Sequence, residues 1–312
     1  MKAVQINSYG KPDVIHIVDI PVPQVTPNHV LVQVHAASIN AVDWKISTGA
    51  YAKMMPVTFP ITLGGDFSGV VTEVPEGVSE FAVGDEVYGN AIATSTGSGS
   101  MAEYVNAPTK SMSKKPVEVD WTQAAALPLV GVSALQALVE EMHLSAGQKI
   151  LIHGGAGGIG STAIQLAKHL GAYVITTVSG EDRDFVTSLG ADEVIDYKTQ
   201  KFEEIVKDVD AIYDTVGGET AEKSLDILKR GGTIVSMLGQ PDPQKAKEKG
   251  INSIGQQTRT TTDRLMQLTK LVDEGAIKIQ IDKVYPINQA RDAFIYQEDI
   301  HPRGKVVILV KE

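Results

Sequence analysis

The sequence predicts an α/β protein in which a doubly wound parallel sheet is joined to a second, β-rich part. Three observations predict this class. Short β-rich runs broken by proline and glycine occupy residues 1–121, and a β-α-β alternation occupies residues 122–273. From residue 274 the β-rich texture returns and ends in the strand-like run KVVILV. The β-α-β part is therefore either inserted into the first part or followed by a return to it.

Composition narrows the classes of function. The 312 residues carry a formal net charge of −10 and contain no cysteine. The acidic balance argues against nucleic acid or an anionic membrane surface as a partner. The absence of cysteine excludes disulfides, thiol nucleophiles and zinc sites built on thiolates. Neither a signal-peptide core nor an apolar run of membrane-spanning length is found, so a cytoplasmic location is expected.

The first 121 residues predict strands with long connections. The runs VLVQVHAASIN, DFSGVVTEV and GDEVYG combine β-branched and aromatic residues between glycine and proline breaks, a pattern typical of strands. The segment TSTGSGS at residues 94–100 predicts a flexible surface loop.

The central segment alternates apolar strands with helical stretches. The strands are expected in KILIH, AYVITTV, EVI, DAIYD and TIVSML. After KILIH, a helical spacing places Ile159, Ala163 and Leu166 on one face, and the helix is expected to end at Gly171. Such alternation predicts a parallel sheet covered by helices on both faces.

A glycine-rich turn between the first of these strands and its helix is the strongest local signal. Gly155, Gly157 and Gly160 fit G-x-G-x-x-G in the run HGGAGGIG. One glycine permits the tight turn, one lets the backbone approach a pyrophosphate, and one lets helix pack on strand. The helix N-terminus then offers free N–H groups to phosphates. The turn predicts dinucleotide binding by residues Gly155, Ala156, Gly157, Gly158, Ile159 and Gly160.

The end of the next strand bears on which dinucleotide binds. NAD-binding proteins usually carry an acidic residue there, which accepts from the ribose 2′-hydroxyl. The expected strand-end residue is Ser179, and Arg183 lies one helical turn beyond it. A hydroxyl and a guanidinium suit a 2′-phosphate, so NADPH is the expected cofactor. Glu181 and Asp182 lie close by, and Arg183 as a solvated helix residue is the alternative.

Several segments together resemble the medium-chain dehydrogenase/reductase superfamily, in particular its zinc-independent quinone oxidoreductase branch, which includes zeta-crystallin. They span nearly the whole chain in the family's order: AASINAVDWKISTGAY, LGGDFSGVV, VGDEVYG, AEYV, LPLVGVSALQAL, IHGGAGGIG, YDTVGG and RGKVVILV. The resemblance implies a discontinuous GroES-like catalytic domain, residues 1–121 and 274–312, around a Rossmann NADP(H)-binding domain, residues 122–273. It also implies a homodimer.

The resemblance implies that no metal takes part. Zinc-dependent alcohol dehydrogenases carry a cysteine where this chain has Asn40, and Gly-His-Glu where it has Gly64, Gly65 and Asp66. The lobe with four structural cysteines is missing as well. None of the seven histidines belongs to a closely spaced pair of ligands.

The resemblance also implies further site residues. Asn40 corresponds to the residue that faces the nicotinamide, Lys45 to a possible donor toward a substrate oxygen, and Tyr51 to a tyrosine at the cleft mouth. For Lys45 a solvated surface charge is the alternative, and for Tyr51 a packing role. Asp43 and Asp66 are expected to bond backbone, and Arg303 and Lys305 to be either cleft or surface residues. On the cofactor side the resemblance adds Ser133, Tyr197, Thr215, Leu238 and Gly239.

The expected activity is NADPH-dependent reduction of quinones or related conjugated carbonyls. Without a Lewis acid, a saturated ketone is hard to polarise, whereas a conjugated acceptor spreads its developing charge. A 2-alkenal or enone reductase on the same fold is the nearest alternative. A non-catalytic NADPH-binding sensor or structural protein is the alternative from another class.

Overall fold

A computed structural model describes residues 1–94 and 97–311, and these form two compact units. The first contains Met1–Leu129, Thr260–Glu274 and Ile279–Glu312; the second contains Val130–Arg259 and Gly275–Lys278. The chain therefore leaves the first unit and returns to it. Within the part of the chain described, no helix is long and apolar enough to cross a membrane.

The first unit is built mainly from antiparallel strands. A sheet ordered β15-β16-β3-β5-β6-β8 has β7 as a further partner of β3, and a smaller sheet is ordered β2-β1-β4. Because β16 pairs with β3 along Val306↔Ile39 to Leu309↔Ala36, both chain ends build the same sheet. The strands of the two sheets of the first unit are β1 (Lys2–Ile6), β2 (Ile15–Asp19), β3 (His29–Ile39), β4 (Ile61–Thr62), β5 (Asp66–Glu73), β6 (Glu86–Asn90), β7 (Tyr104–Pro108), β8 (Met112–Lys114), β15 (Ile281–Pro286) and β16 (Lys305–Leu309).

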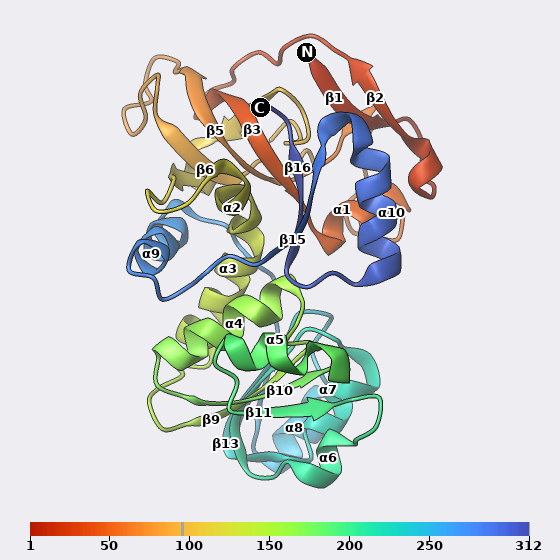
Figure 1. The fold of residues 1–312 in the computed structure, drawn as a ribbon, viewed down its shortest axis with the longest axis vertical. Coiled ribbons are helices and arrows are strands. Elements are labelled where there is room, and N and C mark those ends of the chain that lie inside the picture. The colour runs from red at the N-terminus through yellow and green to blue at the C-terminus, as the bar shows by residue number, and fades with distance from the viewer. Residues whose placement is uncertain (95–96, 312) are drawn as a thin grey trace. The chain divides into compact units, whose positions relative to one another are not determined.

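Helices cover this unit where the sheets would expose apolar side chains. They are α1 (Ala41–Ser47), α2 (Trp121–Ala126), α9 (Thr262–Asp273) and α10 (Ala290–Ile300). Figure 1 shows α10 alongside β15 and β16. Ala290, Ala293 and Phe294 of α10 are buried in one apolar cluster with residues of β1, β3 and β16.

The second unit is a parallel sheet with helices on both faces. Its strands are β9 (Lys149–His153), β10 (Tyr173–Val178), β11 (Glu193–Asp196), β12 (Val209–Asp214), β13 (Leu228–Ser236) and β14 (Asn252–Gly255). Its helices are α3 (Pro128–Leu135, which begins in the first unit), a π-helix (Gln136–Glu141), α4 (Gly158–His169), α5 (Arg183–Ser188), α6 (Phe202–Ile205), α7 (Gly218–Ser224) and α8 (Pro243–Lys249). The order β11-β10-β9-β12-β13-β14 is the strand order of a Rossmann fold.

The local chemistry explains the first β-α-β unit. In β9 every residue after Lys149 is buried, as expected for the centre of a sheet covered on both faces. On α4, Ala163 and Leu166 are buried and Ile159 is half-buried, and the chain leaves the helix at Gly171, whose φ of 81° suits glycine. The strand, the helix and its end lie where the sequence predicts them.

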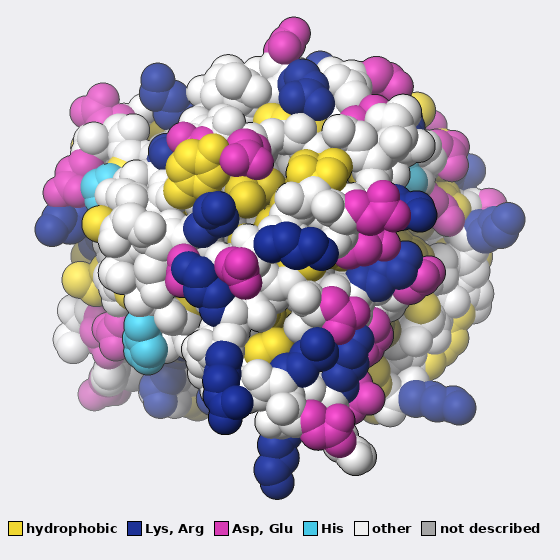
Figure 2. Space-filling view, turned by 90° about the horizontal axis from the view of Figure 1, so that it is seen from below, with side chains coloured by type: hydrophobic (Ala, Val, Ile, Leu, Met, Phe, Trp, Pro, Cys, Tyr) yellow, Lys and Arg dark blue, Asp and Glu magenta, His cyan; other side chains and the backbone are white. Residues whose placement is uncertain are grey.

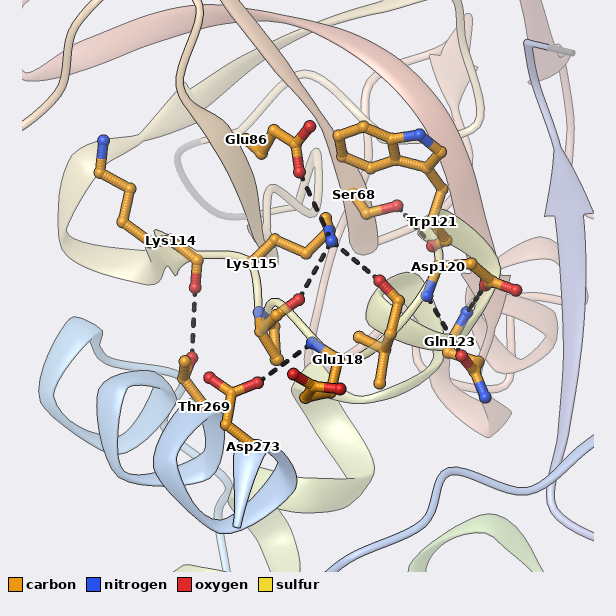
Figure 3. Close-up of polar contacts among 12 residues, drawn as sticks. Ser68, Glu86, Lys114, Lys115, Glu118, Asp120, Trp121, Gln123, Thr269 and Asp273 are labelled. Carbon is orange, nitrogen blue, oxygen red and sulfur yellow. Dashed lines mark hydrogen bonds and ion pairs between the residues drawn. The ribbon is translucent and has the colours of Figure 1, made fainter. Parts of the chain in front are cut away.

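The boundaries of the units differ from those predicted. Residues 122–129 and 260–273 belong to the first unit, although the sequence pattern placed them in the Rossmann domain. Figure 3 shows the reason: Ser68 donates to the carbonyl of Trp121 at the start of α2, and Asp273 of α9 accepts from the amide of Glu118. Both helices are thus tied to the β-rich unit, which helical periodicity alone does not reveal.

Part of the loop predicted at residues 94–100 is anchored. Ser95 and Thr96 lie outside the described residues. Ser100, at the end of the loop, is fully buried, and its hydroxyl donates to the carbonyl of Asp66 at 3.0 Å. Gly99 has a φ of 86° and packs so tightly that a Cβ would lie 2.4 Å from the carbonyl oxygen of Thr62. The prediction of a flexible surface loop is therefore wrong for this end of the segment.

Candidate functional site

The carboxyl edge of the parallel sheet collects most of the predicted cofactor residues. The glycine turn follows β9, Ser179 follows β10, and Tyr197 follows β11. Thr215 follows β12, and Leu238 comes two residues after β13. In open α/β sheets ligands bind at this edge, where the strand order reverses. Here the reversal lies between β9 and β12.

The three glycines of the turn meet different surroundings. A Cβ on Gly155 would lie 2.0 Å from Thr176 Oγ1, and one on Gly160 would lie 2.2 Å from the carbonyl oxygen of Gly154. At Gly157, the N-cap of α4, the nearest atom to a Cβ would be that carbonyl oxygen at 3.6 Å, an ordinary contact. Gly155 and Gly160 are therefore required by packing, whereas Gly157 leaves space beside the helix N-terminus. This cradle fits a pyrophosphate.

The predicted adenosine end is assembled from two neighbouring strands. β10 ends at Val178, so Ser179 is the first residue after the strand, the position assigned from the sequence. Arg183 is exposed and begins α5. Tyr197 is 61% exposed, and its amide donates to the carbonyl of Val178 at 3.1 Å. A hydroxyl, a guanidinium and a phenol thus follow two adjacent strand ends.

The residues assigned to the nicotinamide half lie in two loops that one carboxylate fixes. Asp214, buried at the end of β12, accepts from the amides of Val216 and Gly217 at 3.0 Å and from the hydroxyl of Ser236 at 2.6 Å. Thr215 donates to the carbonyl of His153 at 2.7 Å. Leu238 is 48% exposed. The sequence pattern did not single out Asp214.

Ser133, which is predicted to contact the cofactor, and His153 both have buried side chains that take part in hydrogen bonds. The hydroxyl of Ser133, fully buried on α3, lies 2.7 Å from that of Thr258. His153 is also fully buried, between Thr177 and Ser224 at 3.0 Å from each hydroxyl. Burial lowers the pKa of His153 to about 4, as befits a neutral packed histidine.

In the first unit, polar side chains stand at the adjoining ends of three strands, next to Asn40. β3 ends at Ile39, β5 begins at Asp66, and β16 begins at Lys305. The register pairs Ser38 with Asp66 and Ile39 with Val306, so these strand ends are neighbours. The side chains of Asn40, Asp66 and Lys305 are therefore brought together by the antiparallel pairing itself.

Hydrogen bonds orient the Asn40 amide from both ends. Lys305 donates to its Oδ1, and to the carbonyl of Ile39 at 2.5 Å. The Asn40 Nδ2 donates to Asp66 at 2.9 Å. Asp66 also accepts from the Asn90 side chain at 2.8 Å and from the Leu129 amide at 3.0 Å. Lys305, left open as a cleft or surface residue by the sequence, is 4% exposed.

Asp43 completes a buried cluster of two carboxyl groups and one amine. Its Oδ2 accepts from the backbone N–H of Asn40 at 2.7 Å. Its Oδ1 is buried without a hydrogen-bond partner among the described residues. Burial, opposed by the Asn40 amide and reinforced by Asp66, raises the pKa of Asp43 to about 7. Burial also raises the pKa of Asp66, against Lys305 and its hydrogen bonds. Burial lowers the pKa of Lys305 to about 8.

We expect Asp43→Asn to flatten the pH dependence of stability between about pH 4 and 7. Because the pKa of Asp43 is raised on folding, its stabilisation is full below its ordinary value of 3.8 and is lost as pH rises through about 7. Asparagine mimics the protonated group, so the variant gains about 2–4 kcal/mol relative to wild type over this range. Urea unfolding followed by the fluorescence of Trp44 and Trp121, both in the first unit, measures it. A difference in the free energy of unfolding between variant and wild type that does not change with pH would contradict the raised pKa of Asp43.

The remaining predicted residues of the first unit, Lys45 and Tyr51, form a pair. Lys45, on α1, donates to the hydroxyl of Tyr51 at 3.2 Å, and its Nζ lies 5.1 Å from the centre of that ring. Both side chains are half-buried. Because the ammonium occupies a lone pair of the phenol oxygen, the phenol keeps its own proton to donate. The pair is thus neither a free surface charge nor a purely apolar packing contact.

The described residues offer no ready-made cation site. Within residues 1–94 and 97–311, no group of three His, Asp or Glu side chains is arranged to hold a metal ion. The resemblance places zinc ligands of the zinc-dependent alcohol dehydrogenases at Asn40 and Gly65. The Asn40 side-chain amide is hydrogen-bonded at both ends, and Gly65 has no side chain.

Comparison with known proteins identifies the family of both units. Residues 26–117 match the alcohol dehydrogenase GroES-like domain, and residues 189–308 match the zinc-binding dehydrogenase family. The NADPH-dependent alkenal/one oxidoreductase of Arabidopsis thaliana is 36% identical over 99% of this chain and 79% of its own. The chloroplast envelope quinone oxidoreductase homolog of the same plant is 34% identical over 99% of this chain and 98% of its own.

A solved structure agrees over the full length. The quinone oxidoreductase of Coxiella burnetii superposes with a TM-score of 0.91 at 37% identity, covering 100% of this chain and 99% of its own. The fold and site thus define an oxidoreductase built from a GroES-like unit and a Rossmann unit. The chain belongs to the medium-chain dehydrogenase/reductase superfamily, in its zinc-independent quinone oxidoreductase branch.

Proposed function

We propose that the protein reduces quinones or related conjugated carbonyls with NADPH, without zinc. The observation that carries the proposal is the space at Gly157, on the N-cap of α4 and at the edge where the parallel strands end. A cradle that a Cβ would fill, placed at a helix N-terminus, suits the pyrophosphate of a dinucleotide. The similarity to an NADPH-dependent alkenal/one oxidoreductase supports the same cofactor.

We propose these roles for the cofactor residues. Residues 155–160 hold the pyrophosphate through backbone N–H groups, and Ser179, Arg183 and Tyr197 surround the adenosine phosphate. Thr215, Leu238 and Gly239 lie along the nicotinamide half, in loops that Asp214 fixes. When bound, NADPH supplies a hydride to the acceptor. Ser133, buried on α3 beside Thr258, is proposed as a further cofactor contact.

The first unit provides orientation and a proton donor in this proposal. Asn40, whose side chain is oriented by hydrogen bonds with Lys305 and Asp66, is proposed as a site residue of this unit. Tyr51, whose oxygen accepts from Lys45, donates its proton toward the carbonyl oxygen of the acceptor. A conjugated acceptor needs no stronger electrophile, because its charge spreads over several atoms.

An acceptor panel tests the proposal. NADPH oxidation at 340 nm is followed with 1,4-benzoquinone, 9,10-phenanthrenequinone, a 2-alkenal and a saturated aldehyde, and with NADH in parallel. We expect turnover of the quinones with NADPH preferred, and none of the saturated aldehyde. Reduction of the alkenal alone would replace the quinone assignment by the enone reductase that the alkenal/one relative favours. NADPH binding without any turnover would support the non-catalytic alternative.

We further propose a homodimer located in the cytoplasm. Among the described strands, β14 ends the parallel sheet with β13 as its one neighbour, and such an edge is suited to pairing with a second copy. Sedimentation equilibrium tests the dimer.

Nucleic acid is not a proposed partner. On the face seen in Figure 2, lysine and arginine side chains are interspersed with aspartate and glutamate, so this face offers nucleic acid no surface of a single sign.

A further inference from the structure

A lysine that the family pattern did not assign lies beside the predicted adenosine end. The parallel register pairs Val178 with Asp196, the last residues of β10 and β11. The segments that follow, residues 179–183 and 197–198, therefore leave the sheet side by side. Between these two segments, Lys198 Nζ lies 3.4 Å from Glu181 Oε1. Lys198 thus adds a second cation to the neighbourhood of Ser179 and Arg183.

Asp196, a further nearby carboxylate, is satisfied by different donors. Asp196 accepts from the amide of Lys198 and from the hydroxyl of Thr199, both at 3.0 Å. These bonds hold the pKa of Asp196 below its ordinary value, with the Lys198 amide as the largest cause. The turn that Asp196 fixes places the Lys198 side chain toward Glu181 and leaves its ammonium to that partner.

We propose that Lys198 binds the 2′-phosphate of NADPH and that Glu181 competes with the phosphate for this lysine. The inference rests on the proposed NADPH-dependent function and names the residues that set its cofactor preference. The side chains of the pair are 52% and 80% exposed, and an ion pair so exposed is weak. A phosphate with more charge and more acceptor oxygens displaces it.

This pair accounts for an acidic residue in an NADPH site. An uncompensated Glu181 would repel a 2′-phosphate and accept from the 2′-hydroxyl of NADH. In the absence of phosphate, Glu181 has Lys198 as a cationic partner. The two side chains together therefore set the ratio of NADPH to NADH affinity, with Lys198 favouring NADPH and Glu181 opposing it.

Calorimetric titration with 2′,5′-ADP and 5′-AMP, which differ only in the 2′-phosphate, tests the inference without requiring turnover. For Lys198→Met we expect the Kd of 2′,5′-ADP to rise about tenfold, the loss of one charge-assisted contact, while that of 5′-AMP changes less than about twofold. The matched control is Lys201→Met, which removes another exposed lysine that pairs with Glu204. It should leave both ligands nearly unchanged.

Glu181→Gln tests the opposite effect, because it removes the charge that competes with the phosphate for Lys198. We expect it to tighten 2′,5′-ADP about two- to fivefold in the wild-type background, and by less when Lys198 is already methionine. If wild type binds 2′,5′-ADP more tightly than 5′-AMP and Lys198→Met keeps that preference, the inference is overturned and the proposed function stands. If wild type prefers neither ligand, or binds neither, the inference and the NADPH assignment are both overturned.

Discussion

Replacement of Gly157 by alanine is expected to weaken NADPH binding at least about 30-fold, or about 2 kcal/mol, without unfolding the protein. The added methyl group meets nothing nearer than 3.6 Å within the protein. It therefore projects into the space where the pyrophosphate must approach the helix N-terminus. NADPH fluorescence titration measures the affinity, and thermal unfolding followed by circular dichroism measures the fold.

Gly160→Ala is the matched control, since the same methyl group is added three residues along the same turn. There it would lie 2.2 Å from the carbonyl oxygen of Gly154, and we expect a stability loss of about 1–3 kcal/mol from this overpacking. Equal destabilisation by the two substitutions, or unchanged NADPH affinity in Gly157→Ala, would contradict the assignment of Gly157 to the cofactor.

Lys305→Met is expected to lower the free energy of unfolding of the first unit by about 3–5 kcal/mol. The substitution removes the positive charge from a cluster that retains Asp43 and Asp66, both buried, and leaves the Asn40 Oδ1 and the Ile39 carbonyl without their donor. Urea unfolding monitored by Trp44 and Trp121 fluorescence reports this unit.

Two comparisons isolate the cause. Lys311→Met removes an exposed lysine of the same unit, which donates to Gln33 at 2.8 Å, and should cost less than about 0.5 kcal/mol. Adding Asp66→Asn to Lys305→Met should recover about 1–2 kcal/mol, because one buried charge is then neutralised. A loss no larger than that of Lys311→Met would mean that Lys305 is not the buried partner of these carboxylates.

Sequence alone predicts the parts of this protein that local chemistry determines. The glycine turn was identified because strand, glycine spacing and amphipathic helix occur within some 20 residues. The position of Ser179 directly after its strand is predictable because the apolar run of β10 ends sharply at Val178, whereas its role toward the cofactor stays a prediction. The return of the chain to the β-rich unit was indicated by the strand-like run of β16, and pairing of β16 with β3 confirms it.

The features that were missed depend on contacts between distant segments. Lys305 and Asn40 are 265 residues apart, and nothing in the pattern RGKVVILV separates a buried lysine from an exposed one. The same holds for α9, whose helical pattern resembles that of a Rossmann helix but whose Asp273 and Thr269 bond the β-rich unit. Lys198 is hydrophilic and near a predicted site, but only the register of β10 and β11 brings it to Glu181.

The most direct test of a zinc-free NADPH reductase follows the transferred hydrogen. Chelator-treated protein is incubated with a 2-alkenal and with NADPH deuterated at the transferred position of C4, and the product is analysed by mass spectrometry and NMR. We expect one deuterium on the carbon β to the carbonyl, at a rate that added zinc does not change. Deuterium at the carbonyl carbon, or turnover that requires added zinc, would contradict the account.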